Sequence, residues 1–212
     1  MALVTIRGQL GSGAPEIGKL VADKLHADYI DREIIAQVAS RLRRREEDVH
    51  AKETPPTGLL GRIAEALGHN LPSDAGIAGS YLPVWEIPLD DTRYFKALES
   101  VIRELAQSPS LVINGRGSQF ILKDYPLAFH VQVVAPLELR VKRVMQDLQL
   151  TQDDAKKEIV RFDNSARKFI KRYFQVEVDD SLHYDLVLNT GRLSFQEAAS
   201  VVISALSVKE YT

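Results

Sequence analysis

Apolar residues follow two different periods along this chain. Short, nearly continuous apolar runs occupy residues 3–6, 27–30, 111–113, 128–134 and 185–188, as expected for strands buried on both faces of a parallel sheet. Between them, apolar residues recur every three or four positions over residues 15–26, 32–48, 92–107, 137–147, 151–174 and 194–207, which predicts amphipathic helices. The alternation predicts an α/β fold with a doubly wound parallel sheet. Its ligand would bind at the carboxyl ends of the strands.

Local signals support some of these element ends. Pro136 suits the first turn of a helix, and Ser194 followed by Glu197 forms a capping-box pattern. Thr151, followed by acidic residues, opens the helix expected over 151–174 in the same way. His130 lies inside an expected strand and has no metal-ligand spacing to other histidines, so we expect it to be a packed residue.

Residues 52–91 are the least regular part of the sequence. Five prolines and five glycines interrupt them, and the one helical pattern covers residues 59–67. A long irregular stretch inside a compact domain is usually functional. We therefore expect a substrate-side flap, in which Tyr81 and Trp85 could stack on a base. The alternative is an insertion for packing or subunit contact.

Composition narrows the class of protein. A chain of 212 residues suffices for one sizeable α/β domain. A net charge of −2 gives no indication of nucleic acid or an anionic membrane as a partner. No apolar run approaches the roughly 20 residues of a membrane helix, no signal peptide is evident, and the absence of cysteine excludes disulfides. We expect a cytoplasmic enzyme or binding protein that acts on a small molecule.

The glycine-rich segment after the first expected strand is the strongest functional signal. Gly8, Gly11, Ser12, Gly13 and Ala14 form a turn between a strand and a helix, where backbone amides can surround a phosphate. The pattern G-x-x-x-x-G-K-[ST] is met at its two glycines, but Ala14 replaces the lysine and Pro15 the Ser/Thr. The sequence therefore predicts a phosphate cradle without the usual catalytic side chains.

Two further strand ends carry charged residues. Asp31 follows the second expected strand, and we expect it beside the glycine loop, where it could hold a metal-bound water or orient an attacking hydroxyl. It could also simply cap the next helix. Arg116 stands between Gly115 and Gly117 after the third strand, and its guanidinium could fork onto a phosphate or carboxylate. Alternatively, Arg116 forms a structural salt bridge to a helix.

Two expected helices carry basic residues. Arg140 and Arg143 share one face and could contact a ligand or be solvated. In the helix over 151–174, a basic face that includes Arg161 and Arg172 lies opposite an apolar stripe, and Arg167 lies adjacent to this basic face. Such a face could neutralise a transferring phosphoryl group. The alternative is a solvated face in which Asp163 and Arg167 form an ordinary ion pair.

Together these segments resemble the cytidylate kinase-like family, within the P-loop nucleoside monophosphate kinase fold. The resemblance runs almost end to end and rests on residues 11–18, 29–33, 112–118, 129–136, 171–174 and 184–190. The Gly-Arg-Gly segment and the last segment, Tyr-Asp-Leu-Val-Leu-Asn-Thr, are the most specific. A phosphate loop without lysine is itself typical of this family.

The resemblance implies a P-loop NTPase-type three-layer sandwich with a five-stranded parallel sheet. It further implies one kinase-like domain over 1–212, a phosphate loop for ATP with Mg²⁺, and a mobile basic lid at about 150–175. Arg116 takes the position that holds the acceptor nucleotide. Gly117 stands where other members have an acid that reads cytosine, and Asn114 where the usual Mg²⁺ partner would end the strand. Asp31 and Ser12 are the remaining candidates for the metal.

Three functions stay open from the sequence. The first is an ATP-dependent kinase acting on a small acceptor such as the nucleoside monophosphate CMP. In it Arg116 orients the acceptor, and Arg161, Arg167 or Arg172 closes over the transferring group. The second is a non-catalytic nucleotide- or phosphate-binding module, favoured by the missing lysine. The third is a structural subunit whose basic helix meets an acidic partner. The oligomeric state stays undetermined.

Overall fold

A computed structural model describes residues 2–31, 34, 37 and 92–209 of the chain. The flap expected at 52–91, nearly all of the helix expected over 32–48, and the residues Tyr81 and Trp85 lie outside this part. The fold is described for the remaining residues.

Five strands of the described chain form one sheet in the order β2-β3-β1-β4-β5. They are β1 (Ala2–Gly8), β2 (Asp28–Ile30), β3 (Ser110–Asn114), β4 (Ala128–Val134) and β5 (Leu186–Asn189). Every neighbouring pair is parallel, so all carboxyl ends lie at one edge of the sheet. The β1–β3 register places Ile6 opposite Asn114. The turns that follow β1 and β3 are therefore neighbours at this edge.

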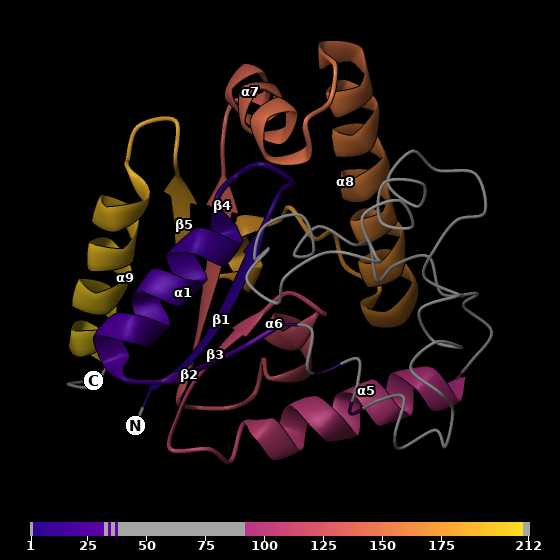
Figure 1. Ribbon diagram of the computed structural model, residues 1–212. Coiled ribbons are helices and arrows are strands. Elements are labelled where there is room, and N and C mark those ends of the chain that lie inside the picture. The colour runs from indigo at the N-terminus through magenta and orange to yellow at the C-terminus, as the bar shows by residue number, and fades with distance from the viewer. Residues whose placement is uncertain (1, 32–33, 35–36, 38–91, 210–212) are drawn as a thin grey trace.

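Helices cover both faces of the sheet (Figure 1). On one face lie α1 (Ala14–Leu25) and α9 (Phe195–Lys209), packed on the strands through one apolar cluster. On the other face lie α5 (Thr92–Leu105), the short α6 (Ser118–Ile121) and part of α8 (Gln152–Phe174). The result confirms the expected three-layer α/β sandwich with a five-stranded parallel sheet.

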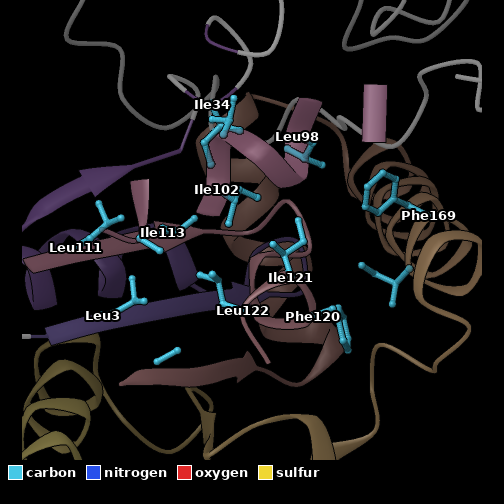
Figure 2. Close-up of a cluster of buried hydrophobic side chains, with 14 of the residues drawn as sticks. Leu3, Ile34, Leu98, Ile102, Leu111, Ile113, Phe120, Ile121, Leu122 and Phe169 are labelled. Carbon is cyan, nitrogen blue, oxygen red and sulfur yellow. The ribbon is translucent and has the colours of Figure 1, made fainter. Parts of the chain in front are cut away.

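The core on the α5 and α8 face is shown in Figure 2. Leu3 of β1 and Ile113 of β3 meet Leu98 and Ile102 of α5 and Phe169 of α8 there. Successive side chains of a strand point to opposite faces of the sheet. Leu3 therefore points into this core, whereas Val4 and Ile6 belong to the cluster on the α1 and α9 face. By the same alternation Thr5 and Arg7 share the side of Leu3. Both are buried polar residues, with exposed fractions of 1% and 5%.

A third, smaller core lies beside the carboxyl edge of the sheet. It joins Leu10, in the turn after β1, to Val144 of α7 (Leu137–Leu148) and Ile159 of α8. Figure 1 shows α7 and the first half of α8 side by side beyond this edge. The turn after β1 is thus packed against α7 and α8 through Leu10.

Most predicted elements lie within two residues of their expected ends. The strand over 128–134 has the predicted bounds. Thr151 caps α8 by accepting a hydrogen bond from the Asp154 amide, and Ser194 and Glu197 form the reciprocal capping box before α9. His130 is packed as expected, with Nδ1 2.8 Å from the Thr5 hydroxyl. The short elements α6 and η2 (Ser181–His183) were not predicted.

Among the described residues, no helix is both long enough and apolar enough to cross a membrane.

Candidate active site

The turn between β1 and α1 has the conformation of an anion-binding loop. Gly11 and Gly13 have φ angles of +76° and +90°, in the region that only glycine adopts readily. The Ser12 amide donates to the Gln9 carbonyl at 2.9 Å and closes the turn. Gly13 is the N-cap of α1 and provides no side-chain cap. The first-turn amides of α1 therefore have no intrahelical acceptor.

The loop is too tightly packed to carry side chains at its glycines. A Cβ on Gly8 would lie 2.2 Å from the Ser12 Oγ, and one on Gly13 would lie 2.2 Å from the Phe195 ring of α9. The Ser12 Oγ is buried and has no hydrogen-bond partner among the described residues. Backbone, rather than side chains, thus forms the inner surface of the loop.

Arg140 and Asp163 anchor the first half of the loop. Arg140 Nε donates to the Leu10 carbonyl at 2.7 Å, and Arg140 Nη2 lies 2.5 Å from Asp163 Oδ2. The other Asp163 oxygen accepts from the Leu10 amide at 3.2 Å. Both side chains are more than 90% buried. The solvated face that the sequence offered for Arg140 was therefore wrong, because the side chain is buried and binds a loop carbonyl and a carboxylate. A ligand contact of Arg140 stays a prediction.

Arg143 and Thr190 anchor the second half of the loop. Arg143 Nη1 donates to the carbonyls of Gly11 and Ser12 at 3.2 and 3.3 Å and to Thr190 Oγ1 at 2.8 Å. The Thr190 hydroxyl donates to the Ser12 carbonyl at 2.7 Å. The Arg143 guanidinium also stacks 4.8 Å from the centre of the Phe195 ring. Arg143 is half-buried behind the loop, so a solvated face was the wrong expectation here too.

These anchors decide which way the loop amides point. In a planar trans peptide, a carbonyl and the following N–H point in opposite directions. The carbonyls of Leu10 and Ser12 point toward Arg140, Arg143 and Thr190. The amides of Gly11 and Gly13 therefore point away from these side chains, which leaves them available to an anion on the other side of the loop.

Acidic residues near the start of α1 have shifted pKa values. Burial raises the pKa of Glu16, in the first turn of α1, and the neighbouring Asp147 raises it further, against the opposing charges of Lys19 and Arg143. Burial also raises the pKa of Asp147, again against Arg143.

The turn after β3 is strained. Gly115, Arg116 and Gly117 are consecutive residues with φ angles of +72°, +60° and +70°. Arg116 is not a glycine, so its left-handed backbone costs about 1–2 kcal/mol. Its side chain is 9% exposed, with Nη2 3.6 Å from Asp31 Oδ1. Strain of this kind is typical of functional sites, and this turn adjoins the phosphate loop through the β1–β3 pairing.

Asp31 contacts residues at and just after the end of β3. Its Oδ2 accepts from Asn114 Nδ2 at 3.2 Å and its Oδ1 faces Arg116. The sequence placed Asp31 beside the glycine loop, but β2 and β1 are not neighbours in the sheet, because β3 lies between them. No group of three or more His, Cys, Asp or Glu residues suited to a metal occurs in the described part of the chain.

The arginines of α8 differ in their surroundings. Arg167 follows Asp163 by four residues, so it lies on the helix side that meets the phosphate loop. Arg161 and Arg172 lie about 160° and 180° around an ideal helix from Asp163. Arg161 Nη2 pairs with the buried Glu158 carboxylate at 2.8 Å. The expected pair between Asp163 and Arg167 does not form, because Arg140 binds Asp163 and Asp179 binds Arg167.

Comparison with known proteins agrees with this architecture. The sequence model of the cytidylate kinase-like family matches residues 3–192. The chain belongs to this family. The resemblance inferred from the sequence is thereby confirmed.

Individual relatives of this cytidylate kinase-like chain are distant. The cytidylate kinase of Sulfolobus acidocaldarius is 24% identical over 206 residues, which cover 97% of this chain and 94% of that protein. The cytidylate kinase of Archaeoglobus fulgidus is 22% identical over 215 residues, which cover 98% and 96%.

Solved structures share the fold. An uncharacterized protein from Eubacterium ventriosum has a TM-score of 0.68 at 17% identity and covers 98% of this chain and 99% of its own. A shikimate kinase from Bacteroides thetaiotaomicron has a TM-score of 0.50 at 13% identity, with coverage of 97% and 98%.

Gly117 of this cytidylate kinase-like chain has no room for a side chain. A Cβ there would lie 2.9 Å from the Phe174 ring and 3.3 Å from Ile170 Cδ1, both of α8. Phe174 belongs to an aromatic group with Phe95 and Phe120. The end of α8 therefore fills the space that an acid at position 117 would need.

A cavity of about 320 Å³ lies on the α6 side of the sheet, apart from the phosphate loop. Its walls include Phe120 of α6, His130 of β4, Phe174 of α8 and Tyr184. None of residues 8–14 lines it.

Several residues that shape the site were missed in the sequence. Asp163 interrupts the apolar stripe of its helix, and this acid on a buried face was a usable signal. Thr190 was noted only as part of a resembling segment. Arg7, Asp179 and Phe195 carry no local signal, because their partners lie far away in the sequence.

Proposed function

We propose that this chain transfers a phosphoryl group from ATP to a nucleoside monophosphate. Membership in the cytidylate kinase-like family supports nucleotide phosphotransfer in general. The names of the relatives make CMP the first acceptor to test. One observation carries the proposal: the loop carbonyls are bound from behind, so the amides of Gly11 and Gly13 point the opposite way.

The phosphate loop would hold the donor. ATP supplies the γ-phosphoryl group and leaves as ADP. The amides of Gly11, Gly13 and Ala14 would bind its phosphate oxygens, while Gly8 and Ser12 keep the loop compact. Arg140 and Arg143 polarise the loop peptides through their carbonyls, which strengthens the amides as donors.

The strained turn after β3 would hold the acceptor. Arg116 offers a planar fork suited to a phosphate, and Asp31 would orient that fork. Because the turns after β1 and β3 are neighbours, the two phosphates would meet at this edge, where proximity and charge neutralisation carry the catalysis.

The missing loop lysine has to be compensated. One charge contact with a transition state is commonly worth about 3 kcal/mol, or about 10²-fold in rate. Arg167 is the arginine of α8 that best fits this role by its position near Asp163. Arg161 and Arg172 would serve only after α8 rearranges, as a lid at about 150–175 would allow. This lid, and a flap at 52–91 within one domain over 1–212, stay part of the proposal.

Magnesium would depend on the nucleotide for most of its ligands. The Asp31 oxygens already face Asn114 and Arg116, and Asn114 stands where an acid would offer a further ligand. The buried Ser12 hydroxyl has no hydrogen-bond partner in the described part of the chain. These donors fit an ion bound mainly through phosphate oxygens and water.

Phosphoryl transfer from labelled ATP–Mg²⁺ to a panel of nucleoside monophosphates and small hydroxyl acceptors tests the proposal. We expect transfer to at least one nucleotide, and a loss of about 10²-fold in kcat/KM in Arg116→Ala. Arg103→Ala is the control, because Arg103 forms an exposed pair with Glu99 on α5. Full activity in Arg116→Ala would refute the acceptor site.

A non-catalytic nucleotide-binding module is the second candidate. Ala14 and Pro15 favour it, since they stand where a phosphate-binding lysine and a metal-binding hydroxyl would be. Absence of transfer to every acceptor, with ATP still raising the melting temperature, would favour this function over the kinase.

A further inference from the structure

Asp179 joins two arginines from different parts of the fold. It lies between α8 and η2, and its Oδ1 accepts from Arg7 Nη1 at 3.0 Å. Its Oδ2 accepts from Arg167 Nε at 2.9 Å. One carboxylate therefore connects the end of β1 to α8.

The two arginines differ in burial. The Arg7 side chain is 6% exposed and also donates to the Val178 carbonyl at 3.3 Å. Arg7 directly precedes Gly8, so Asp179 is fixed with respect to the start of the phosphate loop. The Arg167 side chain is 45% exposed. Arg7 thus anchors the carboxylate, and Arg167 is the partner with room to reach a ligand.

The bonds of Arg167 orient its guanidinium. Its Nε donates to Asp179, and its Nη1 donates to Asn164 Oδ1 at 3.1 Å. A guanidinium has five N–H donors, so its bonds to other described residues leave three unused, including both on Nη2. The unused donors lie on the two terminal nitrogens, which a planar guanidinium presents together as a fork suited to a phosphoryl group.

Asp179 keeps its charge in this setting. Burial by itself would raise the pKa of Asp179, but the charges and hydrogen bonds of Arg7 and Arg167 outweigh it and hold the pKa below its usual value. The carboxylate is therefore ionised at neutral pH.

We propose that Asp179 is a positioning residue that holds Arg167 in the orientation in which its free N–H groups contact the transferring phosphoryl group. This inference rests on the function proposed above. An exposed ion pair contributes little to stability, so its effect should appear in the rate. A misplacement of about 1 Å in a group that contacts the reacting atoms can cost about 10²-fold.

A double-mutant cycle in the full chain tests this proposal. Asp179→Asn keeps an oxygen for Arg7 but loses the charge that orients Arg167. We expect kcat to fall about 10- to 100-fold with little change in KM for ATP. In the Arg167→Ala background the same change should have no further effect, because Asp179 acts through Arg167. Independent, additive losses would overturn the proposal.

Glu177→Gln is the matched control. Glu177 pairs with Lys171 of α8 at 2.6 Å from the same segment, and this pair includes neither Arg7 nor Arg167. We expect wild-type kcat in this variant. Should Asp179→Asn not fold, Asp179→Glu keeps a charge for Arg7 but displaces the carboxylate from Arg167. A wild-type kcat in Asp179→Glu would overturn the proposal.

The activity of the wild type distinguishes a failure of this inference from a failure of the proposed function. If the wild type transfers phosphate and the losses in the double-mutant cycle are additive, only the role of Asp179 is refuted. If the wild type is inactive on every acceptor, both the proposed function and this inference are refuted.

Discussion

At the residue scale, Gly13 is the loop position with the least freedom to change. Its φ angle is +90°, and a Cβ would lie 2.2 Å from the Phe195 ring. A left-handed backbone costs a non-glycine residue about 1–2 kcal/mol, and overpacking adds about 1–3 kcal/mol. We expect Gly13→Ala to lower the free energy of unfolding by about 2–5 kcal/mol, measured by urea denaturation.

Gly115 provides the control for this prediction. Its φ angle is +72°, but no atom of the described residues, apart from Gly115 itself and its two chain neighbours, lies within 4 Å of where its Cβ would be. Gly115→Ala should therefore cost only the backbone penalty of about 1–2 kcal/mol. Equal losses in the two variants would show that the contact with Phe195 does not constrain the loop.

At the element scale, the pair of Arg140 and Asp163 joins α7, the phosphate loop and α8. Asp163→Ala would leave the Arg140 charge buried without its partner and the Leu10 amide without its acceptor. Breaking one half of a buried pair commonly costs about 3–5 kcal/mol. We expect a loss of that size in the free energy of unfolding, measured by urea denaturation, together with weaker binding of ATP.

The exposed pair of Arg103 and Glu99 on α5 is the comparison. Its side chains are 56% and 37% exposed, and exposed pairs contribute about 0–1 kcal/mol. Glu99→Ala should therefore be nearly neutral. A loss below about 1 kcal/mol in Asp163→Ala as well would contradict a structural role for the buried pair.

At the scale of the whole molecule, the proposed donor and acceptor sites follow two separate strands of one sheet, β1 and β3. Binding of ATP at 100 times its Kd should stabilise the protein by about 2.7 kcal/mol, which raises Tm by about 5–10 °C in a chain of this size. We expect Arg116→Ala to keep this shift and to lose the shift caused by CMP, measured by differential scanning fluorimetry.

Loss of both shifts in Arg116→Ala would show that Arg116 supports the whole edge of the sheet instead of one site. Absence of any shift with ATP in the wild type would favour the structural-subunit hypothesis, since a ligand that binds the native state must stabilise it.

The site was less predictable than the fold. Arg140 and Arg143 share a helix face, and the sequence offered only a ligand or solvent as their surroundings. Their actual partners, the carbonyls of Leu10 and Ser12, lie about 130 residues away. The partners of Asp31 could not be predicted either, because they depend on the order of strands in the sheet.

The sequence by itself determined most of the described secondary structure, the α/β class and the position of the phosphate loop. These follow from periodicity and from glycines within a few residues of one another, so local physics is sufficient. Tertiary structure alone decided that β3 separates Asp31 from the loop, that Phe174 fills the space beside Gly117, and that Asp179 connects Arg7 to Arg167. Such contacts join distant segments, and only the packing of helices on the sheet brings them together.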